Sequence, residues 1–247
     1  MENTLYVALS RQTALWRNLE TSANNMANMN TPAYKAMEPH FTQYFTKTSN
    51  DERLLKDKLT YTHDFGIVRD LSDGALQKTG NDLDFGINGD GYFVLDTVDG
   101  ERYTRNGHFK LNNEGMIVTE DGNPLLGQDG KPFFIAPDEA KITLFKDGTL
   151  STENGPIGKV KLVAFDDRLK LKETYSGMYK TVEGNEPKET VETALEQGML
   201  EQSNVKPVVE MTKVIALHRA YEATNKLIDA ENQRRDKMMD TFARVYQ

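Results

Sequence analysis

The middle of the chain contains the stretch that decides the fold, Leu83-Asp84-Phe85-Gly86-Ile87-Asn88-Gly89-Asp90-Gly91-Tyr92-Phe93-Val94-Leu95. Apolar and polar side chains alternate before the glycines, and a second apolar run follows them. Glycine and aspartate between two such runs favour a tight turn. The stretch therefore predicts two short strands joined by a turn.

The same pattern of short apolar runs and turn residues continues over residues 82–165. Its turn signals are Asn-Gly and Asp-Gly pairs, which tolerate the positive φ angles of tight hairpins: Asp99-Gly100, Asn106-Gly107, Asp121-Gly122, Asp129-Gly130 and Asp147-Gly148. Strands at these intervals are typical of a small antiparallel barrel or sandwich. We predict such a central β domain over residues 70–200.

Glycine is confined to this middle region. All 18 glycines lie between Gly66 and Gly198. Because glycine destabilises a helix by about 1 kcal/mol per site, the glycine-free ends are suited to long helices. The distribution predicts an α+β chain in which N- and C-terminal helices flank the β domain.

The N-terminal end carries an apolar stripe at helical spacing, interrupted by Gln12. Its members are Leu5, Ala8, Leu9, Leu15, Trp16, Leu19, Ala23, Met26 and Ala27. The helix should stop near Asn28 to Pro32, because asparagine tolerates the left-handed cap and proline disfavours helix in the residue before it. We predict an N-terminal assembly helix in residues 1–30. The polar residues 31–69 predict an extended linker region, with room for a hairpin.

The C-terminal end, from Pro207 to Tyr246, predicts a longer helix of about 60 Å. Apolar and polar residues follow an approximately seven-residue repeat: Met211, Val214, Ile215, His218, Tyr221, Asn225, Ile228, Asn232, Met239, Phe242 and Tyr246. Such a helix exposes an apolar seam unless the N-terminal helix or a neighbouring subunit covers it. We predict a C-terminal assembly helix in residues 201–247 and a coiled-coil-like pair of terminal helices.

Three polar residues, Asn225, Asn232 and Arg235, lie on the path of this seam. One interpretation is an ordinary two-helix hairpin whose polar residues face water. The other is that buried polar positions fix the register of several packed helices, as asparagine does in coiled coils.

Composition excludes several classes of protein. The 30 Lys and Arg against 38 Asp and Glu give a net charge of -8, which argues against a general nucleic-acid binder. The acidic excess lies in the middle region. There is no cysteine, so disulfides, thiolate zinc sites and a cysteine nucleophile are excluded.

No catalytic or metal-binding pattern emerges. The histidines are isolated, and the sequence has no metalloprotease helix and no nucleophile elbow. Calcium ligands are available at Asp82, Asp84, Asn88 and Asp90, but a twelve-residue calcium loop counted from Asp84 ends on Leu95 instead of glutamate. We predict no catalytic residue, no metal site and no cofactor, and a protein that is not an enzyme.

The chain opens without the basic and apolar segments of a classical signal peptide and has no apolar stretch long enough to span a membrane. We predict no membrane insertion. A cytosolic protein and one exported without a cleaved signal fit equally well.

Five segments resemble motifs of the bacterial flagellar rod and hook protein family, in the family's order and over nearly the whole chain. They are Ala23-Asn24-Asn25-Met26-Ala27-Asn28-Met29-Asn30-Thr31 with Tyr34-Lys35, Leu83 to Phe93, Tyr103-Thr104-Arg105-Asn106-Gly107-His108-Phe109, Gly198-Met199-Leu200-Glu201-Gln202-Ser203-Asn204-Val205, and Arg219-Ala220-Tyr221-Glu222-Ala223. One departure is Pro32-Ala33, where the family has a glycine before the tyrosine. Losing that glycine removes easy access to positive φ at the helix exit.

The resemblance implies a structural subunit of the basal-body rod that transmits torque in motility. Chain length and the opening Leu5 to Gln12 look most like proximal-rod members, with distal-rod and hook members as the alternative. The implied partners are other proximal and distal rod subunits, copies of this chain, and the flagellar type III export apparatus. Nucleic acid is not among them. The implied location is the periplasm-spanning rod of the flagellar basal body, reached without a cleaved signal peptide.

Two other functions remain open from the residues alone. One is an acidic β module that binds carbohydrate or calcium and dimerises through helical arms. The other is a hydrolase whose site the spacing does not declare.

For the leading hypothesis, the subunit contacts should come from both terminal helices. The residues expected to make them are Leu5, Leu9, Trp16, Leu19, Asn24, Asn25, Asn28, Met211, Ile215, Tyr221, Ile228, Met239 and Phe242.

Overall fold

The structure, a computed structural model, describes residues 2–47, 58–136, 141–175, 177–190 and 193–245. The chain forms two compact units, each of which gathers segments that are distant in sequence. The helical unit consists of Met1–Met29, Ala36–Asp70 and Val205–Gln247, and the β unit of Asn30–Lys35 and Leu71–Asn204. The chain therefore passes from one unit to the other several times along its length.

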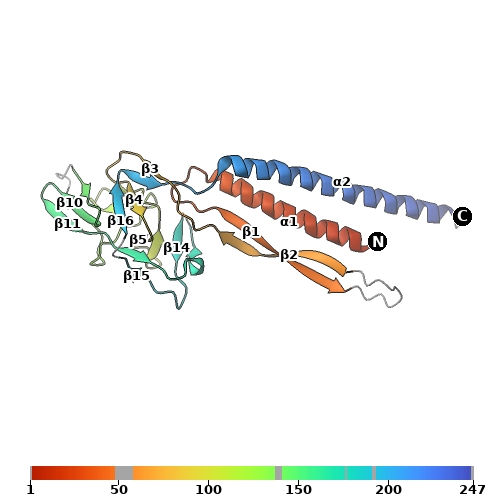
Figure 1. The fold of residues 1–247 in the computed structure, drawn as a ribbon, viewed down its shortest axis with the longest axis horizontal. Helices are drawn as coiled ribbons and strands as arrows, with labels where there is room; N and C mark the ends of the chain where they lie inside the picture. Colours follow the sequence, from red (N-terminus) through yellow and green to blue (C-terminus); the bar gives the residue numbers. More distant parts are fainter. Residues whose placement is uncertain (1, 48–57, 137–140, 176, 191–192, 246–247) are drawn as a thin grey trace. The chain divides into compact units, whose positions relative to one another are not determined.

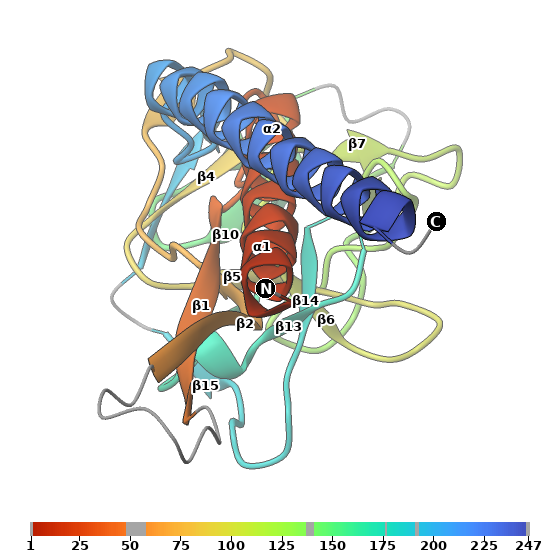
Figure 2. The same cartoon turned by 90° about the vertical axis from the view of Figure 1, so that its right-hand side faces the viewer.

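The helical unit contains two helices and one hairpin. Helix α1 (Glu2–Ala27) and helix α2 (Pro207–Val245) lie side by side and run in opposite directions (Figure 1). The hairpin of β1 (Met37–Lys47) and β2 (Lys58–Arg69) packs on α1 on the side away from α2 (Figures 1 and 2). Helix α1 is thus covered on two faces.

Helix α1 ends at Ala27, close to the predicted stop. The side chain of Asn25 is buried there and forms two hydrogen bonds with β1. Its Nδ2 donates to the Met37 carbonyl oxygen at 2.8 Å, and the Met37 N–H donates to its Oδ1 at 2.9 Å. The asparagine at this position therefore fastens the hairpin to the end of α1.

The hairpin is antiparallel, from Met37 opposite Arg69 to Lys47 opposite Lys58. Its register shifts between His40 and Phe41, and His40 faces Gly66, whose φ is 146°. A residue without a Cβ suits this irregular site because the conformation is rare for other residues.

The β unit contains the remaining strands and one short 3₁₀ helix. These elements are β3 (Leu76–Lys78), β4 (Phe85–Asn88), β5 (Tyr92–Leu95), β6 (Arg102–Thr104), β7 (Lys110–Leu111), β8 (Ile117–Val118), β9 (Thr143–Leu144), β10 (Thr149–Thr152), β11 (Gly155–Lys159), β12 (Leu162–Ala164), η1 (Arg168–Lys170), β13 (Lys172–Glu173), β14 (Met178–Lys180), β15 (Lys188–Glu189), β16 (Ala194–Gln197) and β17 (Met199–Glu201).

The largest sheet of this unit has six strands in the order β13-β14-β6-β5-β12-β15. Strand β5 is buried on both faces: Phe93 and Leu95 belong to one apolar cluster, and Tyr92 and Val94 to another. The sheet ends at β13 and β15, so the described strands do not close into the barrel that the sequence predicted as one alternative. The other described strands of the β unit are short and form smaller sheets of two or three strands.

The Asp-Gly pairs behave as predicted, since Gly100, Gly122, Gly130 and Gly148 all have positive φ. The prediction is wrong for Asn106-Gly107, because Gly107 is not among the glycines with positive φ in the described residues. Glycine is needed there for close approach: a Cβ on Gly107 would lie 1.8 Å from the Phe85 carbonyl oxygen.

Candidate functional site: helix faces and a buried ion cluster

The two helices are held in register by a small group of side chains. The rings of Trp16 and Tyr221 lie 5.9 Å apart between centroids. Gln12 Nε2 donates to the Tyr221 hydroxyl at 3.3 Å and also to Asn225 Oδ1. The residue that interrupts the apolar stripe of α1 is therefore the one that meets a polar residue on the seam of α2.

Helix α2 extends beyond α1. Gln12 lies opposite Asn225, and the two helices are antiparallel. The start of α1 at Glu2, ten residues before Gln12, therefore lies opposite about Arg235 of α2. The remaining residues of α2, 236–245, form about 15 Å of helix past the start of α1. Figure 1 shows this extension at the blue end of α2.

The seam of α2 continues into the extension without a covering helix. Tyr221 and Ile228 are half-buried where α1 is present, and Thr224 is buried. Past the start of α1, Met239 is 72% exposed and Phe242 is 63% exposed. Two large apolar side chains on the inner stripe of the helix thus face solvent.

A second exposed apolar strip lies near the start of α2. Val208, Met211 and Ile215 follow one another at helical spacing and are all exposed. On α1, Leu9 and Trp16 are more than half exposed. Each helix therefore presents apolar surface beyond what the pair itself buries.

The predicted contact residues fall into three groups. Exposed ones are Leu9, Trp16, Asn24, Met211, Ile215, Met239 and Phe242, and half-buried ones within the helical unit are Leu5, Leu19, Asn28, Tyr221 and Ile228. Asn25 is buried against the hairpin. The structure brings Trp16 and Tyr221 together, and it links Asn24 with Asn28, whose Nδ2 donates to Asn24 Oδ1 at 2.7 Å.

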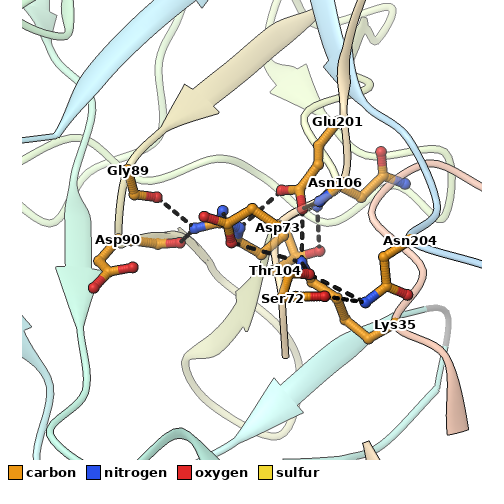
Figure 3. A network of polar contacts seen from close by, with 12 residues as sticks. Lys35, Ser72, Asp73, Gly89, Asp90, Thr104, Asn106, Glu201 and Asn204 are labelled. Carbon is orange, nitrogen blue, oxygen red and sulfur yellow. Dashed lines mark hydrogen bonds and ion pairs between the residues drawn. The ribbon is translucent and has the colours of Figure 1, made fainter. Parts of the chain in front are cut away.

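The β unit contains an ion cluster of three buried side chains, Lys35, Arg105 and Glu201, with the half-exposed Asp73, which we call the Glu201 cluster (Figure 3). Glu201 Oε1 accepts from Lys35 Nζ at 2.7 Å and from the Gly74 N–H at 2.9 Å, and Oε2 accepts from Arg105 Nε at 2.9 Å. The Glu201 side chain is 2% exposed, so protein donors take the place of water as hydrogen-bond partners of this carboxylate.

Arg105 anchors the cluster in the β unit. One terminal nitrogen, Nη2, donates to Asp73 Oδ1 at 2.8 Å, and the other, Nη1, donates to the carbonyl oxygens of Gly89 and Gly91 at 2.8 and 2.9 Å. With the Nε bond to Glu201, all three guanidinium nitrogens are engaged. Lysine could not reproduce this set, because its single ammonium lacks the planar fork.

The cluster keeps Glu201 ionised. Burial by itself would raise the pKa of this carboxyl, but the charge of Arg105 and the hydrogen bond and charge of Lys35 outweigh burial, and the Gly74 N–H adds to them. The net result is a Glu201 pKa below the ordinary glutamate value.

The backbone beside the cluster has one unusual residue, Ala33, whose φ is 57°. Its N–H donates to the Glu201 carbonyl oxygen at 2.8 Å. Residue 33 has the left-handed conformation after helix α1 although it is alanine here and glycine in the family motif. Surrounding contacts must therefore offset a cost of about 1–2 kcal/mol.

We predict that Ala33→Val lowers the free energy of unfolding by about 2 kcal/mol, since a β-branched residue is a strong outlier at positive φ. Ala33→Gly should change it by less than about 1 kcal/mol, because easier access to positive φ offsets the loss of one methyl group and the entropy of glycine. Urea unfolding of the full chain measures both values. A glycine variant as unstable as the valine variant would contradict the left-handed assignment.

Three of the four residues considered for calcium have other side-chain partners in the structure. Asp84 is buried, and its Oδ1 lies 2.7 Å from His108 Nδ1 while its Oδ2 accepts from Thr79 Oγ1 at 2.6 Å. Asp90 pairs with Arg168, and Asn88 donates to Glu196. Within the described residues, no group of three or more histidine, aspartate or glutamate side chains is arranged to hold a metal ion.

Comparison with known protein families gives three matches along the chain. Residues 5–35 match a family described as flagella basal body rod protein, residues 86–152 the flagellar hook protein FlgE/F/G D1 domain, and residues 196–241 the flagellar basal body rod FlgEFG protein C-terminal family. The first and last matches cover most of α1 and of α2.

Curated relatives resemble the chain over nearly its full length. The flagellar basal-body rod protein FlgF of Caulobacter vibrioides is 38% identical over 231 residues, which are 93% of each chain. The chain belongs to the flagellar basal-body rod protein family. FlgF of Mesorhizobium japonicum is 31% identical over 98% of both chains, and FlgG of Bacillus subtilis is 30% identical over 94% of this chain and 96% of its own length.

Family membership establishes the general role. A flagellar basal-body rod protein is a structural subunit of the rod and not an enzyme, so the predicted family, function and location in the basal body are confirmed at this level. The carbohydrate, calcium and hydrolase alternatives are not favoured. In the part of the chain that the structure describes, neither helix is long and apolar enough to cross a membrane.

Lys35, Arg105 and Glu201 lie inside three separate motifs that resemble the rod family, but the sequence alone indicates no role for them. Glu201 lies 166 residues from Lys35 and 96 residues from Arg105, so no local spacing could reveal their contact. The signal available in the sequence was a charged residue within each of three motifs whose other residues are mostly uncharged.

Proposed function

We propose that this chain is a proximal-rod subunit that assembles through its terminal helices with copies of itself and with other proximal and distal rod proteins. The proximal assignment is supported by the FlgF relatives, of which the Caulobacter vibrioides protein is 38% identical to the chain, whereas the Bacillus subtilis FlgG is 30% identical. A distal-rod or hook subunit is the alternative.

The observation that carries this proposal is the uncovered end of α2. Met239 and Phe242 continue the seam that α1 covers elsewhere, and they are exposed in the single chain. A helix of another subunit would bury them in the way that α1 buries the preceding turns, with coiled-coil-like packing. The helical unit thus leaves the apolar seam at the end of α2 uncovered.

Contacts of this kind support filament growth and torque. When one face of a subunit binds a different face of the next subunit, the contact can repeat from subunit to subunit. Repetition of this contact by a screw operation builds a helical filament. Many such interfaces together transmit torque without a catalytic residue. The proposal includes delivery of the chain to the rod by the flagellar type III export apparatus.

A photoreactive amino acid placed at position 242 tests the proposal. In assembled basal bodies it should cross-link to another rod subunit or to a second copy of this chain. The matched control is position 98: Val98 is fully exposed in the β unit, at the turn between β5 and β6, and lies on no helix.

The proposal expects several-fold more intersubunit product from position 242 than from position 98. Equal yields from both positions would contradict it. Cross-links from position 242 only to residues of the same chain would contradict it as well.

A further inference from the structure

All three segments through which the β unit joins the helical unit meet at the Glu201 cluster. The chain leaves α1 through residues 30–35, leaves the hairpin through residues 71–75 and enters α2 through residues 201–204. One side chain of the cluster comes from each: Lys35 from the first segment, Asp73 from the second and Glu201 from the third. Arg105, on the turn after β6, supplies the fourth.

Side-chain contacts join the segments in every pairing. Lys35 Nζ reaches Glu201 at 2.7 Å and the Ser72 carbonyl oxygen, also at 2.7 Å, which links the first segment to the other two. Asn204 Nδ2 donates to the Ser72 carbonyl oxygen at 3.1 Å and to Ser72 Oγ at 3.2 Å (Figure 3). No segment is therefore held by a single neighbour.

Backbone hydrogen bonds repeat two of these three connections, those of the first and second segments with the third. The Ala33 N–H donates to the Glu201 carbonyl oxygen at 2.8 Å, and the Gln202 N–H to the Ala75 carbonyl oxygen at 2.9 Å. The Asn204 N–H donates to the Tyr34 carbonyl oxygen at 3.3 Å. Because these bonds lie between segments, losing one segment leaves polar groups of another unpaired, and the bond between Ala33 and Glu201 joins two buried residues.

The charged side chains of the cluster depend on one another for partners. Lys35 and Arg105 side chains are 5% and 3% exposed, and Glu201 is their buried counter-ion. Asp73 is 48% exposed and contacts both cations from the outside. Removing one partner from a buried pair is strongly destabilising because it leaves an uncompensated charge.

We propose that the Glu201 cluster is a junction clamp that fixes the three connecting segments on the β unit together, so that they are released as one. Glu201, Lys35 and Arg105 are positioning residues in this clamp. The clamp brings together residues from three rod-family motifs, Tyr34-Lys35, Tyr103-Thr104-Arg105 and Leu200-Glu201. The assignment is independent of which subunits the helices contact.

Hydrogen exchange of the full-length chain with Glu201→Gln tests the clamp. The variant keeps the shape of the side chain and removes its charge. The Ala33, Gly74 and Gln202 amides, one in each segment, should together exchange at least about tenfold faster. The Leu126 amide, which donates to the Val94 carbonyl oxygen in the core at 2.9 Å, should keep its protection.

Glu196→Gln is the matched control. Glu196 lies on β16, and its carboxylate accepts from Asn88 in an exposed hydrogen bond at 3.2 Å. The substitution removes the same charge from a nearby strand and should leave the three reporter amides unchanged. Equal acceleration of those amides in the control would contradict the clamp.

A second variant tests the clamp without a change of charge. A Cβ on Gly74 would lie 1.8 Å from the Gln202 carbonyl oxygen, so Gly74→Ala forces residues 71–75 away from residues 201–204. If the segments are released together, the Ala33 amide of the first segment should also exchange faster. Faster exchange confined to residues 71–75 and 201–204 would overturn the proposal, as would loss of protection at Leu126 in both variants.

Acid provides an independent readout. Glu201 faces Lys35 and Arg105, with Asp73 and Tyr92 nearby, and its folded-state pKa is below the ordinary value of 4.5. The charge therefore stabilises the folded chain above pH 4.5, and this contribution is lost as the pH falls through the folded-state pKa. Protection at Ala33 and Gly74, corrected for intrinsic exchange, should fall with acid in the natural chain and change less in Glu201→Gln. The same acid dependence in both would contradict the clamp.

Discussion

Replacing Met239 and Phe242 together by aspartate is expected to weaken association between subunits by at least about a hundredfold. Burying a methionine or phenylalanine contributes about 1.5–3 kcal/mol each, and about 1.4 kcal/mol is a factor of ten in affinity. Both side chains are largely exposed in the single chain, so the helix itself should form unchanged. Analytical ultracentrifugation of the purified chain over a concentration series measures the loss.

The matched control carries the same two charges on another face of the same helix. Gln233 and Thr241 are exposed on α2 and lie off the seam of Tyr221, Ile228 and Phe242. Aspartate at both positions should change association by less than about threefold, the scale of a surface-charge effect. If the control weakens association as much as the seam variant, net charge and not the seam governs assembly.

Gly107→Ala is expected to destabilise the β unit by about 3 kcal/mol, the upper end of what an overpacked site costs. The added Cβ would lie 1.8 Å from the Phe85 carbonyl oxygen and 3.1 Å from the Phe93 ring. The Phe85 N–H donates to the Gly107 carbonyl oxygen at 2.9 Å, so the two backbones cannot separate without losing this bond. The free energy of opening at the Leu126 amide, from native-state hydrogen exchange, measures the effect.

Gly91→Ala is the control for this substitution. Its Cβ would meet Thr193 at 3.5 Å, an ordinary contact, and should cost less than about 1 kcal/mol. Equal losses of stability in the two variants would contradict this account. They would show that replacing any glycine destabilises the β unit, whether or not another backbone lies close to it as at Gly107.

The sequence predicted the elements whose signals are local. Apolar spacing along Leu5 to Ala27 identified α1, and Pro207 with the seven-residue repeat identified α2. Asp-Gly pairs placed turns whose glycines have positive φ. Periodicity and turn chemistry depend on neighbours within a few residues, which is why they could be read without tertiary information.

The features that the sequence did not reveal depend on contacts between distant residues. Glu201 and Lys35 are 166 residues apart in the sequence, and no pattern within one motif indicates that they form an ion pair. Ala33 adopts the conformation of the missing glycine while its N–H is held by the Glu201 carbonyl oxygen. The closed barrel was a wrong alternative because spacing indicates how many strands to expect but not which edges pair.

Electron cryo-microscopy of the assembled rod tests most directly whether the helix faces hold the subunits together. The side chains of Met239 and Phe242 should be buried against helices of neighbouring subunits, with Val208, Met211 and Ile215 also covered. Both side chains facing solvent in the assembled rod, with subunit contacts running through residues 85–165 instead, would contradict assembly by the terminal helices.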